Sequence, residues 1–255
     1  NTVLSDVFDD NRRGAMWQLF VEDYNNAWVA EDVNQLNIRA TGDVNDIAAL
    51  YVSNGWSFDV NENFKVKVDF HYSNISQADG WIGIIVENND NYVSISTGSD
   101  NDESYFYYEA FVDGNTVFEQ ELRDSNDGTL YISFDANSNN LYLSHVGYGE
   151  SNAYTWQTIP NPLQCEWTSP VDVAIGGGSD KVLIAPDEAY LDNLELTTAT
   201  LLGWPPITDI NKDGFVDWLD VETISENWLQ TGSYVPGDIN GDNAVDFLDW
   251  ADFAW

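Results

Sequence analysis

Two acidic segments in the last part of the chain repeat one spacing of oxygen-bearing side chains. The first, Asp209–Asp220, and the second, Asp238–Asp249, align without a gap. Each carries Asp or Asn at segment positions 1, 3, 5, 9 and 12, and Gly214 or Asn243 stands at position 6. Glycine adopts a positive φ freely, and asparagine is the next-best residue there. Both segments therefore favour compact, sharply turned loops.

Calcium accounts for this spacing, because Ca²⁺ is a hard cation that takes oxygen ligands from alternate positions of a tight loop and from the backbone carbonyl at position 7. We predict one ion in each loop. The ligands predicted in the first loop are Asp209, Asn211, Asp213, Phe215, Asp217 and Asp220, and those in the second are Asp238, Asn240, Asp242, Ala244, Asp246 and Asp249. The alternative is a pair of acidic surface turns.

A helix pattern follows each loop, and none precedes it. The first loop matches the pattern D-x-N-x-D-G-x-V-D-x-x-D, and residues 207–255 resemble a type I dockerin domain. The resemblance implies a small α-helical calcium-binding module that docks onto a partner module outside the cell. Dockerins often carry small polar or charged residues at positions 10 and 11. Here these positions are Trp218–Leu219 and Phe247–Leu248, which implies a more apolar contact.

Residues 1–196 follow a strand pattern instead. Apolar and polar residues alternate through Asn63–Tyr72, which is typical of a strand with one buried face and one wet face. Turn signals at Asn88–Asn91, Asp113–Asn115 and Asn137–Asn140 separate further strands. About a dozen antiparallel strands predict a mainly β protein built on a two-sheet jelly-roll sandwich.

Short phrases mark the two ends of this region. They are Val7–Asn11 followed by Trp17 at the start, and Tyr190–Leu196 at the close. They are similar to the ends of concanavalin-like (laminin-G-like) sandwiches. The resemblance implies a fold used alike for sugar binding, glycan hydrolysis and scaffolding. It leaves open a third calcium ion, held by Asp192 with Asp9 or Asp10.

The predicted domains are the sandwich at residues 1–196, a linker at residues 197–206, and the dockerin-like module at residues 207–255. The linker contains Pro205 and Pro206, which stiffen it. Aromatic residues crowd the module, which is too small to bury them alone. We therefore predict a docking surface formed by Trp218, Trp228, Phe247, Trp250, Phe253 and Trp255. The partner is left open between a receptor module, the sandwich of the same chain, and another copy of the chain.

A formal net charge of −36 makes nucleic acid and anionic membrane surfaces poor partners. No run of residues approaches the roughly 18 apolar residues of a membrane span, so no membrane insertion is expected. Cys165 is the single cysteine, which excludes an intramolecular disulfide. The calcium loops favour a secreted protein, extracellular or at the cell surface. A chain that begins at Asn1 fits a mature form without its signal peptide.

Paired carboxylates would be needed for a glycosidase. The candidates are Glu109 with Asp113, and Glu119 with Glu121, but the E-x-D-x-x-E strand of sandwich-fold glycosidases is absent. We therefore predict that the protein is not an enzyme. Sugar stacking on exposed aromatic rings is an alternative use of the sandwich. The candidates are Trp81, Tyr105, Tyr107 and Trp156, for which core packing is the competing explanation.

The leading functional prediction is a secreted, non-catalytic structural or adhesion protein. Its calcium-folded module would dock onto a protein partner, and head-to-tail docking between copies would build an extracellular filament. The second hypothesis is a carbohydrate-binding, lectin-like module anchored by a dockerin. A glycan-active enzyme comes third.

Overall fold

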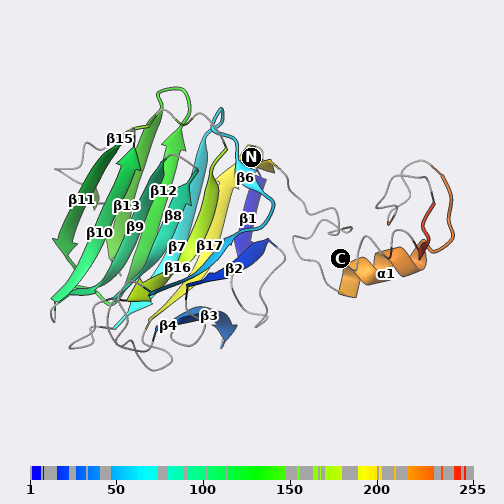
Figure 1. Ribbon diagram of the computed structural model, residues 1–255, viewed down its shortest axis with the longest axis horizontal. Helices are drawn as coiled ribbons and strands as arrows, with labels where there is room; N and C mark the ends of the chain where they lie inside the picture. Colours follow the sequence, from blue (N-terminus) through cyan, green and yellow to red (C-terminus); the bar gives the residue numbers. More distant parts are fainter. Residues whose placement is uncertain are drawn as a thin grey trace. The chain divides into compact units, whose positions relative to one another are not determined.

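The fold is given by a computed structural model of the whole chain (Figure 1). The structure describes residues 2–6, 8, 16–22, 27–32, 34–40, 47–73, 80–88, 91–100, 103–112, 114–147, 154–155, 163–165, 167, 170–179, 189–199, 201–202, 210, 218–232, 237, 244–247 and 250.

The chain divides into two compact units. The larger unit comprises Asn1–Arg13, Gln18–Ser53 and Ser57–Leu202, and the smaller comprises Gly14–Trp17, Asn54–Trp56 and Gly203–Trp255. Within the smaller unit, the Trp56 indole N–H donates to the Met16 carbonyl oxygen at 2.6 Å.

A nine-stranded antiparallel sheet forms one layer of the larger unit. Its main path runs through β14 (Tyr154–Thr155), β13 (Asn140–Gly147), β12 (Asp127–Asp135), β7 (Phe64–Tyr72), β17 (Ala189–Thr198), β4 (Gln35–Ala40) and β3 (Ala27–Asp32). Two further strands lie off this path. They are β1 (Thr2–Asp6), which pairs with β17, and β15 (Leu163–Gln164), which pairs with β13.

A seven-stranded sheet forms the second layer. Its order is β11 (Asn115–Leu122), β10 (Glu103–Val112), β9 (Tyr92–Asp100), β8 (Gly80–Glu87), β16 (Asp172–Ser179), β5 (Ile47–Ser53) and β2 (Trp17–Val21). In Figure 1 these strands overlie those of the nine-stranded sheet. A two-residue pairing joins β6 (Ser57–Phe58) to β18 (Leu201–Leu202).

The core lies between the two sheets. Alternate residues of β7 and of β10 are buried, because successive side chains of a strand point to opposite faces. Phe70 on β7 packs edge-on against Phe106 on β10, with ring centroids 5.7 Å apart. The Tyr72 hydroxyl lies 3.1 Å from the Ser99 hydroxyl on β9. These contacts join the layers and leave each sheet one outer face.

The predicted mainly β, antiparallel sandwich is therefore confirmed. The alternation predicted for Asn63–Tyr72 is β7. Of the predicted Asp113–Asn115 turn, Gly114 has a φ of 77° and Asn115 pairs with Val112 at the start of β11. β17 continues to Thr198, and Leu201–Leu202 forms β18, so the predicted linker at residues 197–206 contains strand residues. Its remaining residues, apart from Ala199, lie outside the described part of the chain.

The smaller unit contains α1 (Trp218–Glu226), and Phe247 and Trp250 are also helical, with the Trp250 N–H donating to the Asp246 carbonyl at 3.2 Å. Ile224 on α1 is buried against Val245, with Ile210 and Trp228 packed beside them. The Leu229 N–H donates to the Val245 carbonyl at 2.8 Å, and the Val245 N–H donates to the Gln230 carbonyl at 3.0 Å. The predicted α-helical dockerin-like module stays a prediction, because most of its loop residues lie outside the described ranges. No helix among the described residues has the length and apolar character that crossing a membrane requires.

Candidate functional site

Aromatic side chains gather on the outer face of the seven-stranded sheet. Phe106 and Tyr108 on β10 point into the core, so Tyr105, Tyr107 and Phe111 between and beyond them point outward. The strand register adds three more aromatic residues to this outer face. They are Phe118 on β11, Tyr92 on β9 and Trp81 on β8. We call these six residues the aromatic face.

The rings of the aromatic face pack in pairs. The centroids of Tyr107 and Phe118 lie 6.2 Å apart at an interplanar angle of 28°, and those of Tyr105 and Tyr107 lie 5.8 Å apart. These separations fall within the roughly 4.5–7 Å of attractive aromatic pairs, so neighbours hold the rings in place. Phe118 nevertheless remains 55% exposed. The arrangement offers ordered aromatic surface to solvent.

Small residues lie beside these rings. Two cross-strand rows run from β10 to β16, one through Tyr105, Gly98, Trp81 and Gly178, and the other through Tyr107, Ser96, Gly83 and Gly176. A Cβ atom at Gly98 would lie 1.8 Å from the Gly80 carbonyl oxygen, and one at Gly83 would lie 2.3 Å from that of Ile95. These two positions exclude side chains, so backbone without side chains lies beside the aromatic rings, and the glycines themselves are buried.

Carboxylates lie along one end of the same face. The Tyr92 hydroxyl donates to Glu109 Oε1 at 2.5 Å, and burial together with this bond raises the pKa of Tyr92 to about 12. Glu87 on β8 stands directly opposite Asp172 on β16. Burial, and then the charge of Asp172, raise the pKa of Glu87. Burial also raises the pKa of Asp172, although Ser53 Oγ donates to it at 3.3 Å.

Of the four carboxylates considered as glycosidase candidates, Glu109 lies on the outer face. Asp113 lies outside the described residues. Glu119 and Glu121 stand opposite Tyr108 and Phe106, which places them on the core-facing side of edge strand β11. The Glu87–Asp172 pair was missed because only the strand order brings β8 beside β16. No local sequence signal reports that order.

Three of the four aromatic candidates are described. Tyr105, Tyr107 and Trp81 lie on the outer face and are only half-buried, so core packing is not their role. Trp156 lies outside the described residues. Phe118, Tyr92 and Phe111 were not selected from the sequence, and only Phe118 has a charged neighbour, Glu119, that could have indicated a strand with one wet face.

Asp192, the residue considered as a ligand of a third calcium ion, lies on β17 opposite Asp69. Burial raises the pKa of Asp192, and the Asp69 charge adds to that rise. Asn193 bridges the two, because its N–H donates to Asp192 at 2.7 Å and its side-chain amide donates to Asp69 at 3.1 Å. Asp9 and Asp10 lie outside the described residues. Among the residues that the structure describes, no group of three or more His, Cys, Asp or Glu is placed to hold a metal ion.

Three predicted loop ligands are described, namely Asp220, Ala244 and Asp246. The fully buried Asp220 accepts the Ile210 N–H through Oδ1 at 2.6 Å, across the predicted first loop. A buried carboxylate that ties the two ends of a loop together fits the hard oxygen set that calcium needs. The remaining predicted ligands lie outside the described ranges, namely Asp209, Asn211, Asp213, Phe215, Asp217, Asp238, Asn240, Asp242 and Asp249.

An apolar hollow of about 500 Å³ lies on α1 in the smaller unit. It is lined by Val221, Ile224, Ser225, Trp228, Phe247 and Trp250. Trp228 and Phe247 pack edge to face, with ring centroids 5.2 Å apart. Three predicted docking residues, Trp228, Phe247 and Trp250, thus line one hollow. Trp218 is exposed outside it, and Phe253 and Trp255 lie outside the described residues.

No family model and no curated protein sequence matches the chain. Solved structures match it by fold. The CBM2 module of the evolved Dit of Lactobacillus casei BL23 phage J-1 matches with a TM-score of 0.56 and 9% identity, over 78% of this chain and 94% of its own. The endo-1,3-beta-glucanase from Streptomyces sioyaensis matches with a TM-score of 0.53 and 9% identity, over 76% of this chain and 95% of its own.

Lectin UEA-II, complexed with galactose, matches with a TM-score of 0.52 and 8% identity, over 78% of this chain and 99% of its own. At these identities the likeness concerns the fold alone. It confirms the predicted concanavalin-like, jelly-roll sandwich. The resemblance to a dockerin stays a prediction.

The prediction that the protein is not an enzyme is contradicted by these neighbours. The same sandwich is the fold of an endo-1,3-beta-glucanase. Lack of a familiar carboxylate spacing was therefore a poor ground for excluding catalysis. Function resides in the site rather than the fold, so the likeness assigns no catalytic residue either.

Proposed function

We propose that the protein binds a glycan at the aromatic face of the seven-stranded sheet. The observation that carries this proposal is the set of ordered, partly exposed rings beside backbone that carries no side chains. Pyranose rings present C–H faces that stack on aromatic rings, while their hydroxyl groups need polar partners. Glu109 and Ser94, which lie opposite each other on β10 and β9, supply such partners on the same face.

The fold neighbours support the class of ligand. The first is named a CBM2 module, a designation for carbohydrate-binding modules. The second is a lectin complexed with galactose, and the third is an endo-1,3-beta-glucanase. The aromatic face here is extended across several strands. It therefore suits several consecutive sugar residues of a chain better than a single monosaccharide.

A glycan array with the intact chain tests the proposal. We expect saturable binding that falls at least about tenfold in Tyr107→Ala and in Trp81→Ala, because each removes a stacking surface. Trp28→Ala is the matched control, since Trp28 is an exposed aromatic residue on β3 of the other sheet. Binding that is equal in all four proteins would overturn the proposal. Chromatography of the bound oligosaccharide after incubation shows whether it is also cleaved.

A second function is favoured by the apolar hollow on α1. We infer that the smaller unit docks onto a protein partner through Trp228, Phe247 and Trp250. Phe247 is 77% exposed beside a hollow lined by apolar side chains, and such surface is typical of protein contacts. The partner is a receptor module or another copy of the chain, and head-to-tail contacts between copies would extend into a filament.

Calcium would order this unit by neutralising the crowded acids of the two loops, and the buried Asp220 carboxylate fits that role. Millimolar calcium is an extracellular condition, so the inference carries a secreted location with it. Light scattering of the intact chain with calcium and with chelator tests both points. Calcium-dependent association that Phe247→Ser abolishes supports docking between copies. Monomers under both conditions would exclude docking between copies and leave a separate protein as the partner. Immobilised wild-type and Phe247→Ser chains, compared in parallel, would then be used to find that partner.

A further inference from the structure

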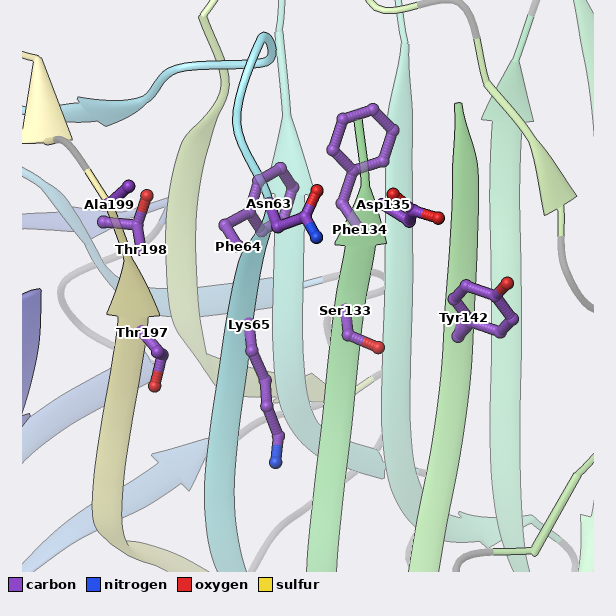
Figure 2. A pocket seen from close by; sticks show the side chains of 10 residues that line it. All are labelled: Asn63, Phe64, Lys65, Ser133, Phe134, Asp135, Tyr142, Thr197, Thr198 and Ala199. Atoms are coloured by element: carbon purple, nitrogen blue, oxygen red, sulfur yellow. The ribbon is translucent and has the colours of Figure 1, made fainter. Parts of the chain in front are cut away.

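The outer face of the nine-stranded sheet carries a separate hollow, on the side of the sandwich opposite the aromatic face. Its volume is about 520 Å³, which lies within the roughly 300–1,000 Å³ of small-ligand sites. Figure 2 shows the side chains around it, near the ends of β7, β12 and β17, with Tyr142 on neighbouring β13. None of these residues was selected as a site from the sequence.

The strand register brings its polar groups together. Thr197 on β17 stands opposite Lys65 on β7, Lys65 stands opposite Ser133 on β12, and Ser133 stands opposite Tyr142 on β13. Directly opposite residues in adjacent strands share one face of the sheet. Two hydroxyl groups, an ammonium group and a 39% exposed tyrosine ring therefore lie in one row.

Two further groups at the strand ends are held in fixed positions. Asp135 accepts the Ser138 hydroxyl at 2.7 Å and the Asn137 N–H at 3.1 Å, and these bonds lower the pKa of Asp135. Asn63 Oδ1 accepts the Ala136 N–H at 3.0 Å, which orients the amide. Within the part of the chain that the structure describes, the amide nitrogen of Asn63 donates to no protein atom. The hollow thus presents the Asp135 carboxylate as a fixed acceptor and the Asn63 amide nitrogen as a fixed donor.

The charges of the hollow balance. Lys65 Nζ lies 4.8 Å from the centroid of the Tyr131 ring, and no carboxylate pairs with Lys65 among the described residues. Asp135 supplies the opposite charge. An anionic ligand would meet Asp135 and a chain of net charge −36, and a cation would meet Lys65. An apolar ligand would strip water from the polar lining without replacing its hydrogen bonds.

We propose that this hollow is a second saccharide site, which binds an uncharged sugar residue stacked on Tyr142 and hydrogen-bonded by Asn63, Lys65 and Asp135. A neutral polyol supplies both donors and acceptors at each hydroxyl, which matches the mixed lining. The proposal does not depend on the aromatic face, because its residues belong to the other sheet. A chain with both sites would hold two glycan strands, one on each side of the sandwich.

The test uses the full chain with Tyr105→Ala and Tyr107→Ala together, so that the aromatic face is disabled. Titrations follow binding of neutral glucose, galactose and xylose tetrasaccharides, with uronate-containing and sulfated tetrasaccharides in parallel. We expect saturable binding of a neutral tetrasaccharide that falls at least about tenfold on adding Asn63→Ala or Tyr142→Ala. Tyr142 is partly exposed, so its truncation leaves the core intact. Asn126→Ala is the matched control, because Asn126 is an exposed asparagine outside the hollow.

Each outcome decides the point. Neutral binding that is lost in both Asn63→Ala and Tyr142→Ala but kept in Asn126→Ala supports the second site. The proposal is overturned if no neutral tetrasaccharide binds the background variant, if binding persists in both hollow variants, or if the charged saccharides bind more tightly. Loss of all binding in the background variant alone would leave the aromatic face as the single glycan site.

Discussion

Glu87 on β8 and Asp172 on β16 stand directly opposite each other on the outer face of the seven-stranded sheet. Burial and mutual repulsion raise the pKa of Glu87, and burial raises that of Asp172. The Asp172 charge therefore disfavours ionisation of the Glu87 carboxyl. The pair lies at the same end of the face as Tyr92 and Glu109, where a bound glycan would bring hydroxyl groups.

Removing one charge of this pair should stabilise the fold. A raised pKa means that the folded state binds more protons than the unfolded state, so the penalty is present above the folded pKa and disappears as the pH falls below the unfolded value. Glu87→Gln should therefore raise the free energy of unfolding at pH 7 only slightly, by less than about 1 kcal/mol, because both side chains are exposed and solvent screens their repulsion. Urea denaturation at pH 7 measures it. The double variant with Asp172→Asn should gain less than the sum of the two single changes, and strict additivity would show that the two carboxylates do not interact.

His145 makes stability depend on pH in the opposite direction. Burial lowers the pKa of His145 to about 4, and its Nδ1 lies at the Tyr108 hydroxyl. Because the folded pKa is below the unfolded value, this stability is present above about pH 6.5 and is lost as the pH falls toward 4. The free energy of unfolding should therefore fall less between pH 6.5 and pH 4 in His145→Gln than in the wild type. Urea denaturation at each pH measures this difference. Identical pH slopes would contradict the assignment.

The bare backbone beside the aromatic rings should not tolerate a side chain. A Cβ at Gly83 would lie 2.3 Å from the Ile95 carbonyl oxygen, so Gly83→Ala should cost about 1–3 kcal/mol of stability. Gly114→Asn is the control. Gly114 has a φ of 77° and open space around it, and asparagine tolerates that conformation. Differential scanning calorimetry should show a lower melting temperature for Gly83→Ala than for the wild type and Gly114→Asn. Equal melting temperatures in all three proteins would contradict the claim that position 83 excludes a side chain.

The smaller unit should lose one calcium ion when Asp220 is neutralised. Asp220→Asn keeps an oxygen for the Ile210 N–H but removes the charge. We expect calorimetric titration with calcium chloride to report two sites in the wild type and one in Asp220→Asn at matched concentration. Asp124→Asn, an exposed change in the larger unit, is the control. A wild type that takes up no calcium would remove the calcium proposal altogether.

Local sequence pattern predicted the strands well but not the sites. Period-two alternation identified β7, and Gly114 marked a hairpin, because both signals lie within a few residues. The Glu87–Asp172 pair and the Lys65, Ser133 and Tyr142 row depend on which strands become neighbours. That order follows from the packing of the whole sandwich, in which β16 lies beside both β8 and β5. Alternation correctly put Tyr107 on a sheet face but could not say whether that face was buried or exposed.

Calorimetric titration of the intact chain with its best glycan from the array tests the aromatic face most directly. The account predicts a dissociation constant at least about tenfold weaker in Tyr107→Ala and unchanged in Trp28→Ala. Equal dissociation constants for the wild type and Tyr107→Ala would contradict it.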